Sequence, residues 1–142
     1  EVEKHWKKLG GALLDRVDLR IPVRPVAAGQ LLGEPGTSSA DLIEGVLRAR
    51  SAQAIRSNGP VPTSNGKLGP AGIARDCSLD RATSSAFTQA VRSVSLSARA
   101  CHSILRVART IADFDGVRDI DLPHLYEAIQ LRRYGDSDYF WT

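Results

Sequence analysis

Residues 96–113 read LSARACHSILRVARTIAD, and this stretch decides the fold. Its apolar residues recur three or four positions apart, which is the spacing of one face of an α-helix. They are Cys101, Ile104, Leu105, Ala108, Ile111 and Ala112. Ser97 is a favourable N-cap residue, so the pattern predicts a helix over residues 97–114.

The opposite side of this helix carries charge. Because seven residues nearly close two helical turns, five polar residues fall on one narrow stripe: Arg99, His102, Arg106, Arg109 and Asp113. Arg99 lies in the first turn, where the helix dipole disfavours a cation. A helix N-terminus with an arginine beside it suits an anion such as a terminal phosphate, so Arg99 is either a phosphate ligand or an ordinary solvated arginine.

Three further helices are predicted, over residues 39–56, 80–94 and 122–133. Ser39 is the expected N-cap of the first, and Pro123 suits the first turn of the last. Residues 58–72 are interrupted by Gly and Pro, which predicts a loop with room for one turn. The C-terminal part is therefore expected to be an all-helical bundle.

The first quarter of the chain has a different pattern. Residues 1–14 predict a short helix that ends near Gly10 and Gly11. Residues 17–23 alternate apolar and polar side chains and predict one strand, and the prolines in and after it favour a sheet edge. A Gly/Pro/Ser-rich stretch over 27–39 predicts a linker. The expected fold class is mainly α, a helical bundle preceded by a short helix and one strand.

Composition limits the classes of function. The 142 residues include no methionine, so we expect a piece of a longer protein; no stretch approaches the roughly 20 apolar residues of a membrane span. We expect a soluble, cytoplasmic protein with no membrane partner. Cys77 and Cys101 are too few and too far apart to suggest a disulfide framework or a metal site. The 15 arginines among 19 cations suit contacts with phosphate.

Two short motifs bear on phosphate chemistry. Gly66-Lys67 superficially matches part of a P-loop, but Val61 and Leu68 stand where that motif needs glycine and Ser or Thr. The chain thus lacks its own ATP-binding loop. Arg16 precedes the predicted strand and lies between Asp15 and Asp18. It is either a surface arginine paired with these acids, or a charge offered to the nucleotide of a neighbouring subunit.

These motifs resemble a known family. Residues 13–19 are similar to the LLDR(I/F)D segment of magnesium-chelatase-like AAA+ proteins, and residues 96–113 to their LSARA…RVARTIAD segment. Residues 120–133 resemble the closing helix of that family. The bacterial competence-associated branch is the most similar. Ala12 and Cys101 depart from the family pattern, where proline and an aromatic residue are common, but neither departure removes a charge.

The resemblance implies the C-terminal lid of an AAA+ ATPase. It implies that Arg16 is an arginine finger acting in trans, and that Arg99 is the second-sensor arginine, which reaches the γ-phosphate in cis. ATP and Mg²⁺ would be held by the full-length parent, a homo-oligomeric ring, expected to be a hexamer. The fragment alone would be no enzyme. The implied division is residues 1–26 for the edge of the AAA+ core, 27–39 for a linker, 40–135 for the helical lid and 136–142 for a tail.

Several alternatives remain open at this point. The competence-type resemblance favours a motor that remodels DNA, with Arg106 and Arg109 as further phosphate or DNA contacts. The ATPase subunit of a magnesium chelatase would share the same motifs. A helical nucleic-acid-binding module would use Arg92 with the arginines of residues 96–113 on backbone phosphates. A pure interaction module would bind neither nucleotide nor nucleic acid.

Overall fold

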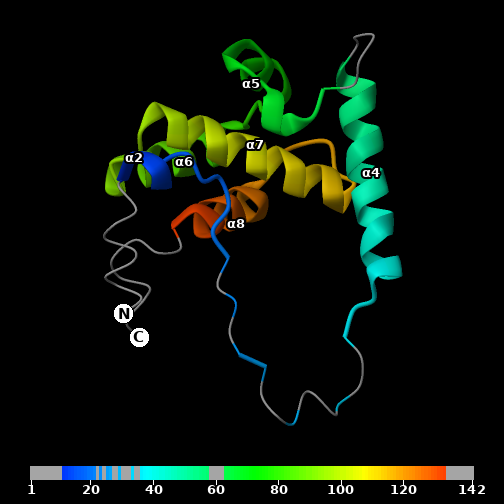
Figure 1. Ribbon diagram of the computed structural model, residues 1–142. Helices are drawn as coiled ribbons and strands as arrows, with labels where there is room; N and C mark the ends of the chain where they lie inside the picture. Colours follow the sequence, from blue (N-terminus) through cyan, green and yellow to red (C-terminus); the bar gives the residue numbers. More distant parts are fainter. Residues whose placement is uncertain are drawn as a thin grey trace.

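The chain folds into a mainly helical bundle, which confirms the expected fold class (Figure 1). The computed structural model describes residues 11–21, 23, 25–26, 29, 33, 36–57 and 63–133. Its helices are α2 (Gly11–Leu14), α4 (Ser39–Ser57), α5 (Pro70–Asp76), α6 (Arg81–Ser93), α7 (Ala98–Asp115) and α8 (Leu122–Arg133), with a 3₁₀ turn η1 (Asn65–Lys67). The first ten residues of the predicted N-terminal helix and the tail over 136–142 lie outside the described residues.

α7 is the central helix of the bundle. It lies on α8 along one side, while α4 crosses its C-terminal end and η1 and α5 lie against it (Figure 1). Its most deeply buried apolar residues are Ile104, Ala108 and Ala112, each at most 1% exposed. They join a core that also contains Leu68, Ile73, Cys77, Ile120, Leu125, Ala128 and Ile129. The apolar periodicity therefore identified the helix around which the core is built.

Local capping sets the helix ends. Ser97 accepts a hydrogen bond from the Ala100 N–H (3.0 Å), and α7 ends at Gly116, whose φ of 75° is left-handed. The helix predicted over 97–114 is thus confirmed. At α4, the Ser38 N–H donates to Asp41 Oδ2 (3.0 Å), and the Asp41 N–H donates to Ser38 Oγ (3.2 Å). The N-cap is Ser38 and not Ser39 as expected, because only Ser38 can close this capping box with Asp41.

One other expectation was wrong and one was incomplete. The described residues of the run 17–23, where a strand was predicted, form no strand. The one β-bridge among the described residues joins Leu79 to Ile120. The loop predicted over 58–72 contains its one turn, η1, but its last three residues already belong to α5, a short helix that begins with Pro70 and buries Ile73.

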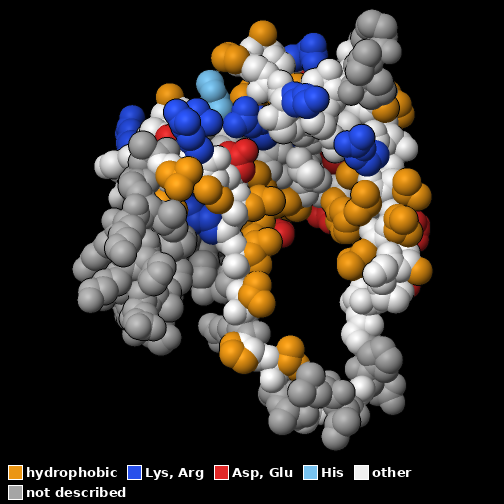
Figure 2. All heavy atoms as spheres, viewed as in Figure 1, with side chains coloured by type: hydrophobic (Ala, Val, Ile, Leu, Met, Phe, Trp, Pro, Cys, Tyr) orange, Lys and Arg blue, Asp and Glu red, His pale blue; other side chains and the backbone are white. Residues whose placement is uncertain are grey.

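α4 packs through its small residues. Gly45 and Ala49 are buried against the bundle, whereas five larger apolar residues of the helix are exposed: Leu42, Ile43, Val46, Leu47 and Ile55. Figure 2 shows hydrophobic side chains along α4 and along the segment that follows α2. An exposed apolar face of this size on a helix indicates a surface that another part of a larger protein covers.

Gly45 allows the close approach of α4 to α7. A Cβ at this position would lie 2.4 Å from Cζ of Phe114. We expect Gly45→Ala to lower the free energy of unfolding by about 1–3 kcal/mol in a urea titration, although alanine favours a helix by about 1 kcal/mol. The control is Gly66→Ala, whose Cβ would meet nothing within 4 Å. If Gly45→Ala is at least as stable as wild type, the ring of Phe114, which is 37% exposed, turns aside without cost and this packing does not require glycine.

The two thiols should differ in reactivity. Cys77 is buried, and its burial raises the pKa of the thiol to about 11. Cys101 is half-buried, and burial raises its pKa as well. At pH 8 the reactive thiolate of Cys77 is on the order of one molecule in a thousand. We expect iodoacetamide to label Cys101 first in the native protein and both in urea, as read by peptide mass spectrometry; equal native rates would contradict the burial of Cys77.

Candidate functional site

The segment that carries Arg16 is fixed to the ends of α7 and α8. Asp15 Oδ1 accepts hydrogen bonds from Ser97 Oγ (3.0 Å) and from Arg132 Nη2 (2.9 Å). Asp18 Oδ1 accepts one from Ser103 Oγ (2.6 Å) and lies 3.7 Å from Arg132 Nη1. The two acids that flank Arg16 therefore hold the segment against the bundle.

Arg132 is the centre of this attachment. Its side chain is 4% exposed, and its guanidinium also donates to the carbonyl oxygens of Val17 (3.0 Å) and Asp15 (2.8 Å). A buried cation needs such a full set of acceptors to offset its lost hydration. Sequence reasoning missed Arg132. Its helical spacing could have predicted its burial, because Arg132 continues the face of α8 that carries the buried Leu125, Ala128 and Ile129.

Arg16 and Arg99 are both exposed, and the contacts of their neighbours bring them to one region. Arg16 follows Asp15, and Arg99 lies two residues after Ser97, so the Asp15–Ser97 hydrogen bond brings both arginines to the N-terminal end of α7. Among the described residues, no carboxylate pairs with either guanidinium. Asp15 and Asp18 instead bind Arg132, so the structure does not have the surface pairing considered for Arg16.

The backbone at this end of α7 also offers hydrogen-bond donors. Ser97 accepts the N–H groups of Ala100 and Cys101, through Oγ and the carbonyl oxygen respectively. Within the described part of the chain, the N–H groups of Ala98 and Arg99 have no such acceptor. Open N–H groups at a helix N-terminus, with two arginines beside them, form a positive end that can bind an oxyanion.

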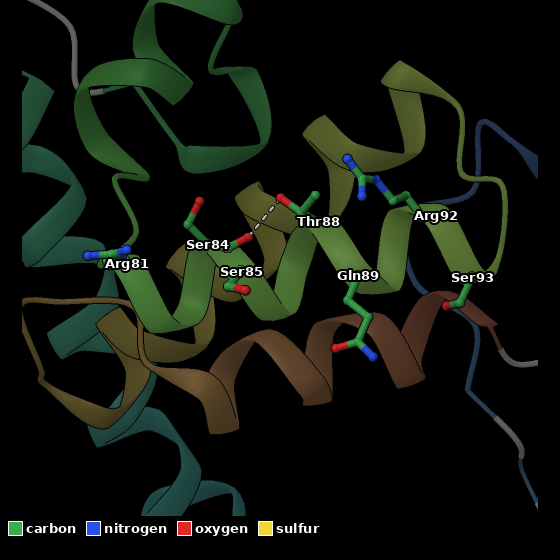
Figure 3. A pocket seen from close by; sticks show the side chains of 7 residues that line it. All are labelled: Arg81, Ser84, Ser85, Thr88, Gln89, Arg92 and Ser93. Carbon is green, nitrogen blue, oxygen red and sulfur yellow. Dashed lines mark hydrogen bonds between the residues drawn. The ribbon is translucent and has the colours of Figure 1, made fainter.

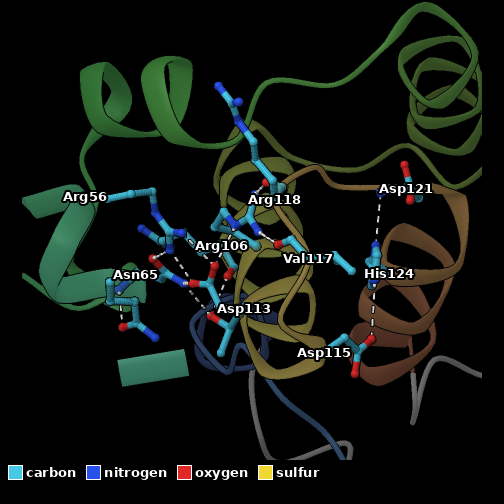
Figure 4. Close-up of polar contacts among 12 residues, drawn as sticks. Arg56, Asn65, Arg106, Asp113, Asp115, Val117, Arg118, Asp121 and His124 are labelled. Atoms are coloured by element: carbon cyan, nitrogen blue, oxygen red, sulfur yellow. Dashed lines mark hydrogen bonds and ion pairs between the residues drawn. The ribbon is translucent and has the colours of Figure 1, made fainter. Parts of the chain in front are cut away.

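The C-terminal half of α7 has a different role. Asp113 is 1% exposed and receives three partners: Arg56 in a close ion pair, Arg109 Nε at 3.1 Å and Asn65 Nδ2 at 2.8 Å (Figure 4). Asn65 Oδ1 also accepts from Arg56 Nη2 (3.3 Å). Since Arg56 comes from α4 and Asn65 from η1, this cluster joins three elements.

The predicted stripe on α7 is therefore only partly exposed. Arg109 is 3% exposed and also donates to the carbonyl oxygen of Val117 (2.9 Å). As a DNA or phosphate contact, Arg109 was a wrong prediction, because α4 and η1 cover this half of the helix. Arg106 is half-buried, and its Nη1 donates to the Leu68 carbonyl oxygen (3.3 Å). Arg99 remains the exposed arginine of the stripe.

His124 has a structural role at the start of α8. Its Nδ1 accepts a hydrogen bond from the Asp121 N–H (2.9 Å), and Nε2 lies 3.4 Å from Asp115 Oδ2 (Figure 4). His124 therefore caps the start of α8, and its side chain is buried.

Comparison with known proteins identifies the family. Residues 36–132 match the family model described as magnesium chelatase, subunit ChlI C-terminal, and this range contains α4 to α8. The chain belongs to the magnesium chelatase ChlI C-terminal family. The helical bundle described above is thus this family's C-terminal domain, and the resemblance inferred from the motifs is confirmed.

Relatives of this magnesium-chelatase-like domain extend the similarity. The chain is 38% identical to Competence protein ComM of Haemophilus influenzae over 93% of its own length and 26% of that protein. It is 34% identical to the uncharacterized protein YifB of Escherichia coli over 91% of the chain and 25% of the relative. A match over 93% of the chain necessarily includes the segment with Arg16. The chain spans about a quarter of the length of these curated relatives.

No helix in the described part of this magnesium-chelatase-like chain has the length and apolar character that a membrane span requires.

The attachment of the Arg16 segment can be tested with trypsin. Replacing Arg132 by methionine keeps the buried volume but removes the hydrogen bonds to Asp15 and Val17. Losing even one charge-assisted bond of about 1.5–3 kcal/mol should raise cleavage after Arg16 at least about tenfold. Arg118→Met, which changes an exposed arginine, is the control. Unchanged cleavage in Arg132→Met would show that the segment is held by other contacts.

Proposed function

We propose that the chain is the nucleotide-sensing part of an ATP-hydrolysing AAA+ ring motor, and that Arg16 and Arg99 both act on the terminal phosphate of ATP. The observation that carries the proposal is the Asp15–Ser97 hydrogen bond, which brings both arginines to one helix N-terminus. Their role is electrostatic, because arginines stabilise the charge that develops on a transferred phosphoryl group. Mg²⁺ and the P-loop belong to the rest of the protein.

The shared attachment bears on which subunit each arginine serves. An arginine finger reaches the ATP of a neighbouring subunit. Since the Asp15–Ser97 hydrogen bond joins the segment of Arg16 to the first turn of the helix that carries Arg99, we propose that both arginines reach the same ATP in trans. The resemblance alone implied that Arg99 acts in cis, and the contacts of Asp15 favour the alternative.

The partners follow from the exposed surface. The apolar face of α4 and the exposed Leu19, Ile21 and Val23 would be covered by the rest of the AAA+ module or by neighbouring subunits. We propose a homo-oligomeric ring, a hexamer, working in the cytoplasm. The competence-type resemblance points to DNA as the substrate that the motor remodels. The family description favours a second candidate, the ATPase subunit of a magnesium chelatase, whose ATP turnover DNA should not stimulate.

The test is ATP turnover by the complete protein. We expect Arg16→Ala and Arg99→Ala each to lower kcat about 10³-fold or more while ring assembly survives, since a finger arginine contributes on this scale. Arg50→Ala, an exposed arginine of α4, should leave turnover unchanged.

Mixing the two mutant proteins distinguishes cis from trans. If both arginines serve the same neighbouring ATP, every subunit of a mixed ring presents a defective surface, and activity stays low. Recovery of activity on mixing would place Arg99 in cis. Normal turnover in both single mutants would contradict a nucleotide role for this end of α7.

A further inference from the structure

α6 has an inner side that the bundle uses and an outer side that it does not. On the inner side Thr83 is buried, and Phe87 and Ala90 pack against the core. The outer side borders a shallow hollow of about 690 Å³. Its lining is polar throughout: Arg81, Ser84, Ser85, Thr88, Gln89, Arg92 and Ser93 (Figure 3).

The charge of this side is entirely positive. Residues 81–112, which include all of α6 and most of α7, contain five arginines and no Asp or Glu. In the ranges that the structure describes, neither Arg81 nor Arg92 has an acidic partner. The two arginines are eleven residues apart, close to three full turns, so they lie on one stripe with Ser85 and Thr88 between them. The stripe is about 16 Å long.

The hydroxyl groups on this side are poor choices for helix stability. Serine and threonine each cost up to about 0.7 kcal/mol relative to alanine at a helix interior position. Thr88 Oγ1 donates to the Ser84 carbonyl oxygen (2.9 Å), but the hydroxyls of Ser84 and Ser85 have no hydrogen-bond partner in the described structure. Residues that weaken a helix and make no contact within the fold indicate a surface that contacts another molecule.

We propose that this outer side of α6 binds the phosphate backbone of DNA, an inference that rests on the proposed DNA substrate. A partner for the stripe must be anionic and extended, because its two arginines are about 16 Å apart along the helix with hydroxyl donors between them. Successive phosphates of one strand follow at about 3.4 Å along the duplex axis, so the stripe passes several of them. Arginine and serine are common donors to phosphate oxygens, and such contacts are independent of base sequence.

The test measures DNA binding by the complete protein as a function of salt, by fluorescence anisotropy with a labelled single strand and the matching duplex. The double variant Arg81→Ala/Arg92→Ala should bind about 10- to 100-fold more weakly at low salt. The slope of log K against log salt should become shallower by about two, because each phosphate that an arginine neutralises adds nearly one to it. Basal ATP turnover should not change, because both arginines belong to α6 and neither is one of the two arginines proposed to act on ATP.

The matched control is Arg50→Ala/Lys67→Ala, which removes two exposed charges on α4 and η1. It should keep the wild-type slope on both DNA probes. If the α6 variant keeps the wild-type slope of log K against log salt while wild type binds DNA, α6 is not the DNA-binding surface, and the proposed DNA substrate is unaffected. If wild type hydrolyses ATP but binds neither probe, the DNA substrate is wrong and the α6 inference falls with it.

Discussion

The guanidinium of Arg132 is the interaction on which the candidate site depends. A cation that is 4% exposed must be surrounded by acceptors, and here they come from Asp15, Asp18, Ser103 and the Val17 carbonyl oxygen. All but Ser103 belong to the segment that follows α2. The electrostatic need of one buried charge on α8 therefore fixes a segment more than a hundred residues earlier in the chain. Removing the cation would leave two half-exposed acids that water can hydrate.

α7 carries a polar cluster at each end, and the two clusters have different consequences. At the N-terminal end, Ser97 binds Asp15 and Ser103 binds Asp18, the two acids that flank Arg16. At the C-terminal end, Asp113 binds Arg56 and Arg109 inside the bundle. Buried ion pairs give little net stability compared with apolar packing, but they are strongly directional. Their effect is to fix the register of α4 and of the Arg16 segment against a single helix.

The sequence predicted the parts of the fold that depend on local signals. α7 and α8 were predicted almost to their ends, because Ser97 and Pro123 act through their own backbone neighbours. α5 was missed because a seven-residue helix depends on burying Ile73, which is a tertiary effect. The positions of Arg16 and Arg99 in the sequence suggested phosphate chemistry, whereas their common location at α7 follows from a contact between residues 82 positions apart.

The burial of Arg109 shows what periodicity leaves undetermined. A helical pattern separates an apolar side from a polar one, but it does not tell whether a second layer covers the polar side. Here α4 and η1 do so, and Arg109 with Asp113 becomes part of the core. Arg99, about three turns before Arg109, is beyond this cover and stays exposed. Under the proposed function, the same helix then presents its free end to ATP and its covered end to α4. A displacement of the N-terminal end by phosphate would move α4 and its exposed apolar face with α7, because the Asp113 cluster allows no separate movement without leaving a buried charge unpaired.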